Sequence, residues 1–121
     1  MKHILIIDDE PEVLRMFTSL LETRYRVTTA RDGQTALECF RDDPADLAIV
    51  DIFMPQTDGL VVIDEFQEID PEVKIIAVSG GGYGGTVDLL SDAEALGACR
   101  SFSKPVDIAA FMTAIEEELG E

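Results

Sequence analysis

The sequence has few basic residues, a single histidine and no long apolar run. Its longest apolar runs cover four or five residues, too few for a membrane span or the core of a signal peptide. Only 9 Lys and Arg side chains oppose 25 Asp and Glu, which gives a net charge of −16. Such a chain repels nucleic-acid phosphates and anionic membranes. We therefore expect a cytoplasmic protein that binds neither directly.

Cysteine is also scarce. Cys39 and Cys99 are far apart, belong to no C-x-x-C motif and have apolar neighbours. This pattern predicts reduced thiols in the core rather than a disulfide or a metal site. The 121 residues fit one domain, which can bury roughly two-thirds of its unfolded surface and needs no such covalent staple.

Apolar runs and amphipathic segments alternate five times along the chain. The expected strands lie at residues 3–7, 25–29, 47–51, 73–78 and 99–102, with helices beginning near residues 11, 33, 60, 87 and 108. Strict β–α alternation favours a parallel sheet covered by helices on both faces. The sequence therefore predicts an α/β, doubly wound, flavodoxin-like (βα)5 domain with strand order 2-1-3-4-5.

Three carboxylates interrupt the apolar pattern at strand ends. Asp8 and Asp9 follow the first strand, and Asp51 ends the third. Asp is common after strands because it favours turns, but these two strands are expected to be neighbours about 4.8 Å apart. Their carboxyl ends border the crevice where open α/β sheets bind ligands. We therefore expect the three carboxylates to converge there.

Converging carboxylates repel one another unless a cation balances them. Oxygen ligands suit Mg²⁺, and the lack of nearby His or Cys argues against Zn²⁺. Lys104, directly before Pro105, ends the fifth strand and Ser79 ends the fourth, so both side chains are expected at the same edge. A carboxylate nucleophile with a metal, an ammonium group and a hydroxyl suits phosphoryl transfer to Asp51.

In this order and at these strand ends, the motifs resemble a two-component response regulator receiver domain of the single-domain, chemotaxis-regulator-like kind. The motifs are Asp8-Asp9, Asp51, Met54-Pro55, Asp58-Gly59, Ser79 and Lys104-Pro105. The resemblance covers essentially the whole chain. It implies a signalling protein rather than a turnover enzyme, with a sensor histidine kinase or phosphotransfer protein as the phosphodonor and an unidentified output protein as the second partner.

The resemblance also implies residue roles. Asp51 would accept the phosphoryl group, and Asp9, Asp51 and the Phe53 carbonyl would ligate Mg²⁺, with Asp8 acting through water. Ser79 and Lys104 would hold the phosphoryl oxygens, and the Lys104-Pro105 peptide bond would be cis.

Two features depart from the family pattern. The position three residues before Lys104, where the family carries a switching aromatic, is Ser101, and Phe102 is expected in the core. A glycine-rich loop at residues 80–85, which includes Gly80, Gly81 and Tyr83, lengthens the segment after Ser79. It is either a permissive insertion or a loop that phosphorylation orders, with Tyr83 replacing the aromatic. Output would then pass through this loop and the face formed by the fourth helix, fifth strand and fifth helix.

Alternative interpretations remain open. An aspartyl-phosphate phosphohydrolase also places a nucleophilic Asp after a strand, although such enzymes use D-x-D and Phe53 stands two residues after Asp51. We expect residues 1–121 to be one receiver domain without an output domain, or else a domain of a larger multidomain regulator. His3 is predicted to be a hydrogen-bonded or edge histidine, and Glu116–Glu118 a solvated helix face.

Overall fold

A computed structural model describes residues 1–54, 57–80 and 86–120. It contains a five-stranded sheet with order β2-β1-β3-β6-β7, in which every neighbouring pair is parallel. The strands are β1 (His3–Ile7), β2 (Arg26–Ala30), β3 (Leu47–Asp51), β6 (Lys74–Gly80) and β7 (Arg100–Lys104). This order confirms the predicted doubly wound, flavodoxin-like fold.

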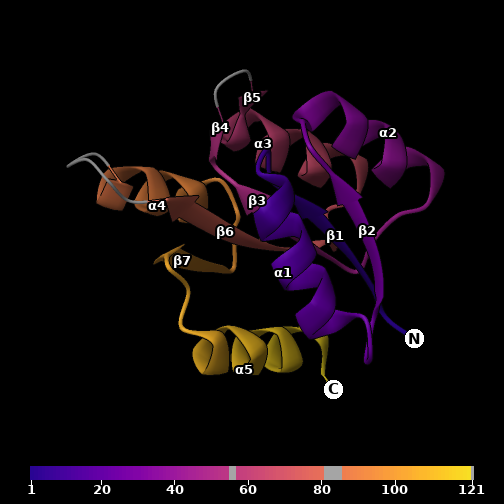
Figure 1. The fold of residues 1–121 in the computed structure, drawn as a ribbon. Coiled ribbons are helices and arrows are strands. Elements are labelled where there is room, and N and C mark those ends of the chain that lie inside the picture. The colour runs from indigo at the N-terminus through magenta and orange to yellow at the C-terminus, as the bar shows by residue number, and fades with distance from the viewer. Residues whose placement is uncertain (55–56, 81–85, 121) are drawn as a thin grey trace.

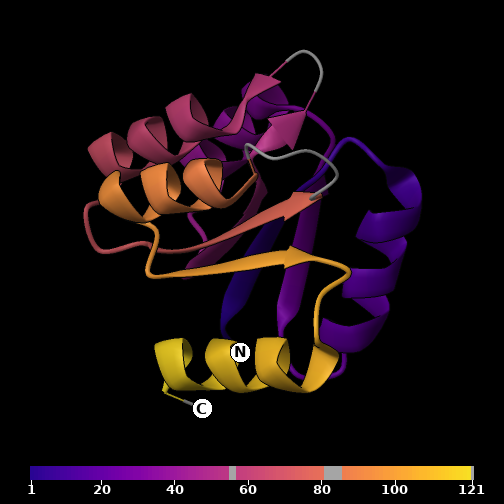
Figure 2. The same ribbon diagram turned by 90° about the vertical axis from the view of Figure 1, so that its left-hand side faces the viewer.

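Helices cover both faces of the sheet (Figures 1 and 2). One face carries α1 (Pro11–Leu21) and α5 (Ile108–Leu119), and the other carries α2 (Gly33–Asp42), α3 (Gly59–Ile69) and α4 (Thr86–Ala95). Within the described ranges, no helix has the length and apolar character that crossing a membrane would require.

Two hydrophobic cores, one on each face, follow from the alternation of side chains along the strands. In β3, Leu47 and Ile49 join the core under α1 and α5, whereas Ala48 and Val50 join the core under α2 and α3. All five residues of β3 are buried, as a central parallel strand requires. Apart from Lys74 at the start of β6, the side chains of β1, β3 and β6 are buried as far as the polar residues at their carboxyl ends.

Aspartates fix the first turns of three helices. Asp32, Asp58 and Asp107 accept backbone hydrogen bonds from Thr35, Leu60 and Ala110 at the starts of α2, α3 and α5. Such caps pair amide groups that the first helical turn cannot pair internally. Three acidic residues, which the sequence shows only as negative charges, thus cap helices in the structure.

Several boundaries and surroundings differ from expectation. In the segment after Asp51, Phe53–Met54 (β4) and Thr57–Asp58 (β5) form a small antiparallel pair that the alternation of strands and helices did not predict. Cys99 is exposed, although its Sγ donates to Ile75 O at 3.2 Å, so the prediction of a core thiol is wrong for this residue. Cys39 is partly buried and packs against the core under α2 and α3. Cys99 precedes the edge strand β7, which has a neighbour on only one side.

The triplet Glu116–Glu118 is not merely a solvated face. Glu116 pairs with Arg24 at 2.6 Å, and Glu117 and Glu118 both contact the Arg100 guanidinium at 3.0 Å. Arg24 follows α1 and Arg100 begins β7, so the triplet links α5 to two neighbouring elements. Residue spacing could not predict these pairs because the arginines lie far away in the sequence.

Candidate functional site

Asp8 and Asp51 lie beside each other at the carboxyl edge of the sheet. The parallel register pairs Ile7 with Val50, so the next residue on each strand is an aspartate. Asp8 is 2% exposed and Asp51 is 3% exposed. Two buried carboxylates at neighbouring strand ends repel each other, and the site needs positive charge to hold both in the ionised state.

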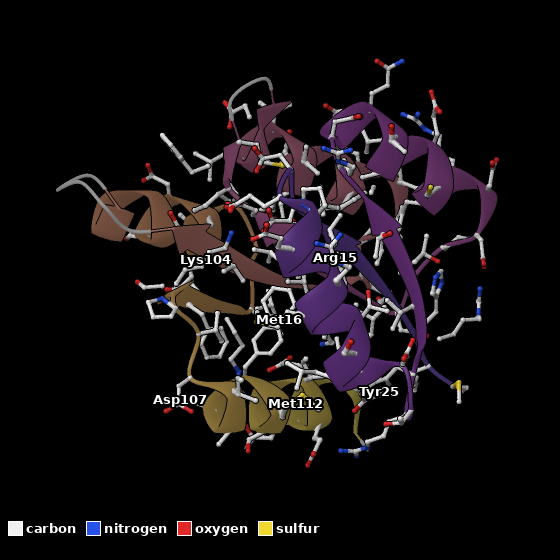
Figure 3. The ribbon with its side chains drawn as sticks, in the orientation of Figure 1. Arg15, Met16, Tyr25, Lys104, Asp107 and Met112 are labelled. Atoms are coloured by element: carbon white, nitrogen blue, oxygen red, sulfur yellow. The ribbon has the colours of Figure 1, made fainter. Side chains whose placement is uncertain are left out.

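Lys104 supplies that positive charge from the end of β7 (Figure 3). Its Nζ donates a hydrogen bond to Asp8 Oδ2 at 2.7 Å and another to Asp51 Oδ2 at 3.3 Å. Glu10 Oε1 lies 3.8 Å from the same nitrogen. One ammonium group therefore joins carboxylates from β3 and from the segment after β1.

The backbone fixes the other oxygen of each buried carboxylate. Phe53 N donates to Asp51 Oδ1 at 3.0 Å, and Glu10 N donates to Asp8 Oδ1 at 2.9 Å. Each aspartate thus binds the amide two residues later and uses its remaining oxygen for Lys104. Both carboxylates are held in defined orientations before any ligand binds.

Burial raises the pKa of Asp51 to about 6, and the nearby Asp8 charge adds to this rise. The Phe53 amide and Lys104 lower the pKa of Asp51, but they do not outweigh burial. Burial also lowers the pKa of Lys104, yet the hydrogen bond to Asp8 and the attraction of both aspartates outweigh it, so this pKa is raised. The lysine therefore stays charged, whereas the acid is poised near neutral pH.

The segment after β1 could hold a metal ion. Ligand oxygens of Asp8, Asp9 and Glu10 lie within 4.8 Å of one another. Asp9 is partly buried and Glu10 is exposed, so the cluster opens to solvent. Carboxylate oxygens of this kind suit a hard cation such as Mg²⁺. Glu10 was not among the residues predicted for the site, although it directly follows Asp8-Asp9.

Ser79 lies on β6, one residue beyond the strand pair of Asp51 and Val78. Its side chain is almost fully enclosed, at 1% exposure, and within the described residues its Oγ has no hydrogen-bond partner. Leaving a buried hydroxyl unpaired is costly. Ser79 therefore offers a free donor at the edge that carries Asp51, although it does not itself bond to Asp51 or Lys104 among these residues.

The switch candidates separate into different surroundings. Ser101 Oγ donates to Glu94 Oε2 of α4 at 2.6 Å. Phe102 faces the opposite side of the sheet and contacts Phe111 of α5 edge-on, with 5.5 Å between ring centroids. Phe102 is partly buried and packs against the core under α1 and α5, which agrees with the prediction that it faces the core.

Other predicted residues lie around this edge. Gly80 pairs with Lys104 at the ends of β6 and β7, and the Lys104-Pro105 peptide bond is cis. Gly81 and Tyr83 lie outside the described residues, as does Pro55. At the opposite edge of the sheet, His3 is 3% exposed and both ring nitrogens have partners, Thr28 Oγ1 at 2.8 Å and Pro44 O at 3.2 Å. Of the two surroundings expected for His3, hydrogen-bonded or edge, the structure thus shows the hydrogen-bonded one.

Gly59 brings the start of α3 against the backbone of Asp51. A β-carbon at this position would lie 2.8 Å from Asp51 O and would overlap the Ile52 Cα. Neither neighbour is a flexible side-chain end, so only glycine fits. The Asp58-Gly59 motif therefore combines a helix cap with the close approach that positions the Asp51 strand end.

Comparisons with known proteins agree with this arrangement. Residues 4–116 match the family model described as the response regulator receiver domain. The chain is 32% identical to the response regulator receiver protein CpdR of Brucella abortus (strain 2308) over 120 residues, 98% of each protein. It is 30% identical to the transcriptional regulatory protein GlrR of Escherichia coli (strain K12), where 118 residues span 97% of this chain but 26% of that protein.

A solved structure has the same fold. The CheY-like response regulator receiver domain protein from Methanospirillum hungatei JF-1 superposes with a TM-score of 0.90 at 26% sequence identity. The match covers 99% of this chain and 94% of that one. The fold of this chain is thus one that an experimentally determined receiver domain protein shares.

Proposed function

Because the chain belongs to the response regulator receiver domains of two-component phosphorelay systems, we propose that Asp51 is its phosphoacceptor. The donor would be the phosphohistidine of a sensor histidine kinase or a phosphotransfer protein. In this proposal residues 1–121 form one receiver domain, a cytoplasmic signalling protein rather than a turnover enzyme. Phosphorylation changes its affinity for an output protein.

One observation carries the proposal: Lys104 Nζ lies within 3.3 Å of carboxylate oxygens from both Asp8 and Asp51. A fixed cation thus lies beside a buried carboxylate whose other oxygen is held by the Phe53 amide. Buried ion pairs contribute little net stability, because desolvation offsets the attraction. A function that needs both charges at this edge explains why the chain keeps them there.

In the transfer step a carboxylate oxygen of Asp51 attacks phosphorus. The new bond joins that oxygen to phosphorus, the bond between phosphorus and the donor's imidazole nitrogen breaks, and that nitrogen takes up a proton from solvent. Lys104 stabilises negative charge on the phosphoryl oxygens, and the unpaired Oγ of Ser79 donates a hydrogen bond to one of them. Ionised Asp51 is required, since only its carboxylate is nucleophilic.

Asp8, Asp9, Asp51 and the Phe53 carbonyl would hold Mg²⁺, with Asp8 acting through water. When bound, the ion neutralises phosphoryl charge and lowers the barrier to transfer. The residues present fit it, because the ligand atoms of the cluster after β1 are carboxylate oxygens within 4.8 Å of one another. A cation bound there would lower the pKa of Asp51, because its positive charge favours the ionised carboxylate.

The output signal would pass through the segment between β6 and α4 and the face formed by α4, β7 and α5. Gly80 and Ser79 lead into this segment, and Ser101 contacts α4 through Glu94. Ordering of residues 81–85 on phosphorylation, with Tyr83 in the role of the missing aromatic, stays a prediction. The side chain of Ser101 already joins β7 to α4. This contact supports signal transmission that does not need a switching aromatic.

Intact-protein mass spectrometry tests the phosphoacceptor. The chain is incubated with a small-molecule phosphodonor and Mg²⁺, alongside Asp51→Asn and the control Asp64→Asn, an exposed carboxylate of α3. We expect one added phosphoryl group on the wild type and the control, none on Asp51→Asn, and none on any protein when EDTA removes the metal. Equal labelling of Asp51→Asn would refute the assignment.

A further inference from the structure

A groove of about 800 Å³ lies between α2 and α3 and extends from the first turns of both helices. These two helices pack side by side on one face of the sheet (Figure 1). Its apolar residues are Leu37 and Val62, which are buried, and Val61, which is 49% exposed. The remaining lining residues are Asp32, Gly33, Gln34, Thr35, Glu38, Arg41, Asp58 and Glu65. We refer to this feature as the α2–α3 groove.

The polar lining of the groove is predominantly acidic. Four carboxylates, two from each helix and its cap, face one guanidinium, that of Arg41. Two of these carboxylates are fixed, because Asp32 Oδ1 accepts from Thr35 N at 2.7 Å and Asp58 Oδ1 accepts from Leu60 N at 2.9 Å. The Thr35 amide also lowers the pKa of Asp32, so this charge persists at mildly acidic pH.

An exposed aromatic side chain lies beside Asp58, one of the residues that line the groove. Phe53 of β4 is directly opposite Asp58 of β5, and opposite residues of an antiparallel pair project to the same side. Its side chain is 62% exposed, whereas the neighbouring residues Ile52 and Met54 are buried. The groove therefore joins an apolar floor and an aromatic rim to fixed negative charge.

We propose that the α2–α3 groove binds an amphipathic segment of a partner protein, with basic side chains against the carboxylates and apolar side chains on Val61 and Phe53. The net charge of −16 disfavours a second copy of this chain, and it repels nucleic acid and anionic lipid. A basic peptide is the occupant whose charge complements the lining. The exposed Val61 and Phe53 give it apolar contacts that a small cation cannot make.

The test uses ¹⁵N-labelled protein and a synthetic peptide with lysines and leucines at helical spacing. Two further probes are the same peptide with glutamate for lysine, and spermine. We expect the basic peptide to shift the amide signals of α2, α3 and β5 at lower concentration than spermine, and the acidic peptide to shift none. Absence of binding, shifts spread over the whole acidic surface, or an equal response to spermine would overturn the proposal.

Matched variants separate the groove from overall charge. Glu38→Gln/Glu65→Gln removes two lining charges and leaves both helix caps intact, whereas Glu68→Gln/Glu72→Gln removes two exposed charges outside the lining. We expect the first pair to weaken peptide binding roughly fivefold to tenfold, and the second about twofold or less. Equal losses of peptide affinity in the two double variants would refute the α2–α3 groove as the binding site.

Two more variants test the apolar contact and the independence of the proposal. Val61→Ser keeps all charges of the groove and is expected to weaken the basic peptide but not spermine; unchanged peptide binding would contradict the amphipathic occupant. Asp51→Asn is expected to bind the peptide like the wild type. Failure of the phosphoacceptor assignment therefore leaves this test unaffected.

Discussion

Replacing Asp51 with asparagine should stabilise the metal-free protein at neutral pH. Burial raises the pKa of Asp51 from its ordinary value of 3.8 to about 6, so the folded chain binds a proton more tightly than the unfolded chain. The stability that this proton supplies is fully present below the unfolded pKa and is lost as the pH rises through the folded pKa. The ionised wild type is thus penalised near neutrality, and the neutral amide that the substitution introduces avoids that penalty.

The magnitude follows from the size of the shift. A difference of about two pKa units, at about 1.4 kcal/mol each, gives a total effect of about 3 kcal/mol. Roughly half of it falls between about pH 5 and about pH 8, since the folded group titrates inside this window and the unfolded group mostly below it. The stability advantage of Asp51→Asn over the wild type should therefore widen by about 1.4 kcal/mol across this range.

Urea denaturation in EDTA at several pH values measures this difference. Asp64→Asn is the control, because it makes the same charge change at an exposed position of α3. Its stability difference from the wild type should not widen in the same way. If the advantage of Asp51→Asn stays constant or shrinks as the pH rises, Asp51 is not held at a raised pKa and the account of the buried acid pair is wrong.

Three further perturbations test the site and the fold. Lys104→Met removes the ammonium that contacts Asp8 at 2.7 Å and Asp51 at 3.3 Å; NMR titration should show the pKa of Asp51 rising further, and an unchanged value would deny the pairing. The Mg²⁺ affinity, measured by calorimetry, should fall about tenfold per pH unit below about pH 6, because a proton must leave Asp51 before the ion binds. An affinity that does not change with pH would show that Asp51 is not a ligand. Gly59→Ala should cost about 3 kcal/mol in urea denaturation because its β-carbon meets the backbone of Ile52 and Asp51. Gly120→Ala, whose β-carbon meets nothing within 4 Å at φ +73°, should cost only about 1 kcal/mol, and equal costs would contradict the close approach.

The fold could be predicted well from the sequence because the buried strands are apolar at nearly every position. The run Leu47–Val50 is apolar at every position, which is typical of a parallel strand covered on both faces. The strand order then placed Asp8 next to Asp51, as the register shows. Local pattern and topology together were sufficient for this part of the site.

Other features depend on contacts that no local pattern reveals. The hydrogen bond from Ser101 to Glu94 and the pairing of Arg100 with Glu117 and Glu118 join elements whose relative orientation is set by packing. The sequence pattern around Cys99 suggested burial, but this residue is exposed and lies directly before the edge strand β7. The residues next to a cysteine in the sequence do not show whether its side chain is covered in the fold.

The missing β-carbon of Gly59 has a consequence for transmission through the domain. Because α3 begins in contact with the backbone of Asp51 and Ile52, the acceptor strand end and the first turn of α3 cannot shift past each other without a clash. They form one mechanical unit, and Asp58, which caps α3 and lines the α2–α3 groove, belongs to it. If the backbone at Asp51 moves, the first turn of α3 must therefore move with it. This turn forms part of one wall of the α2–α3 groove and lies only a few peptide units away.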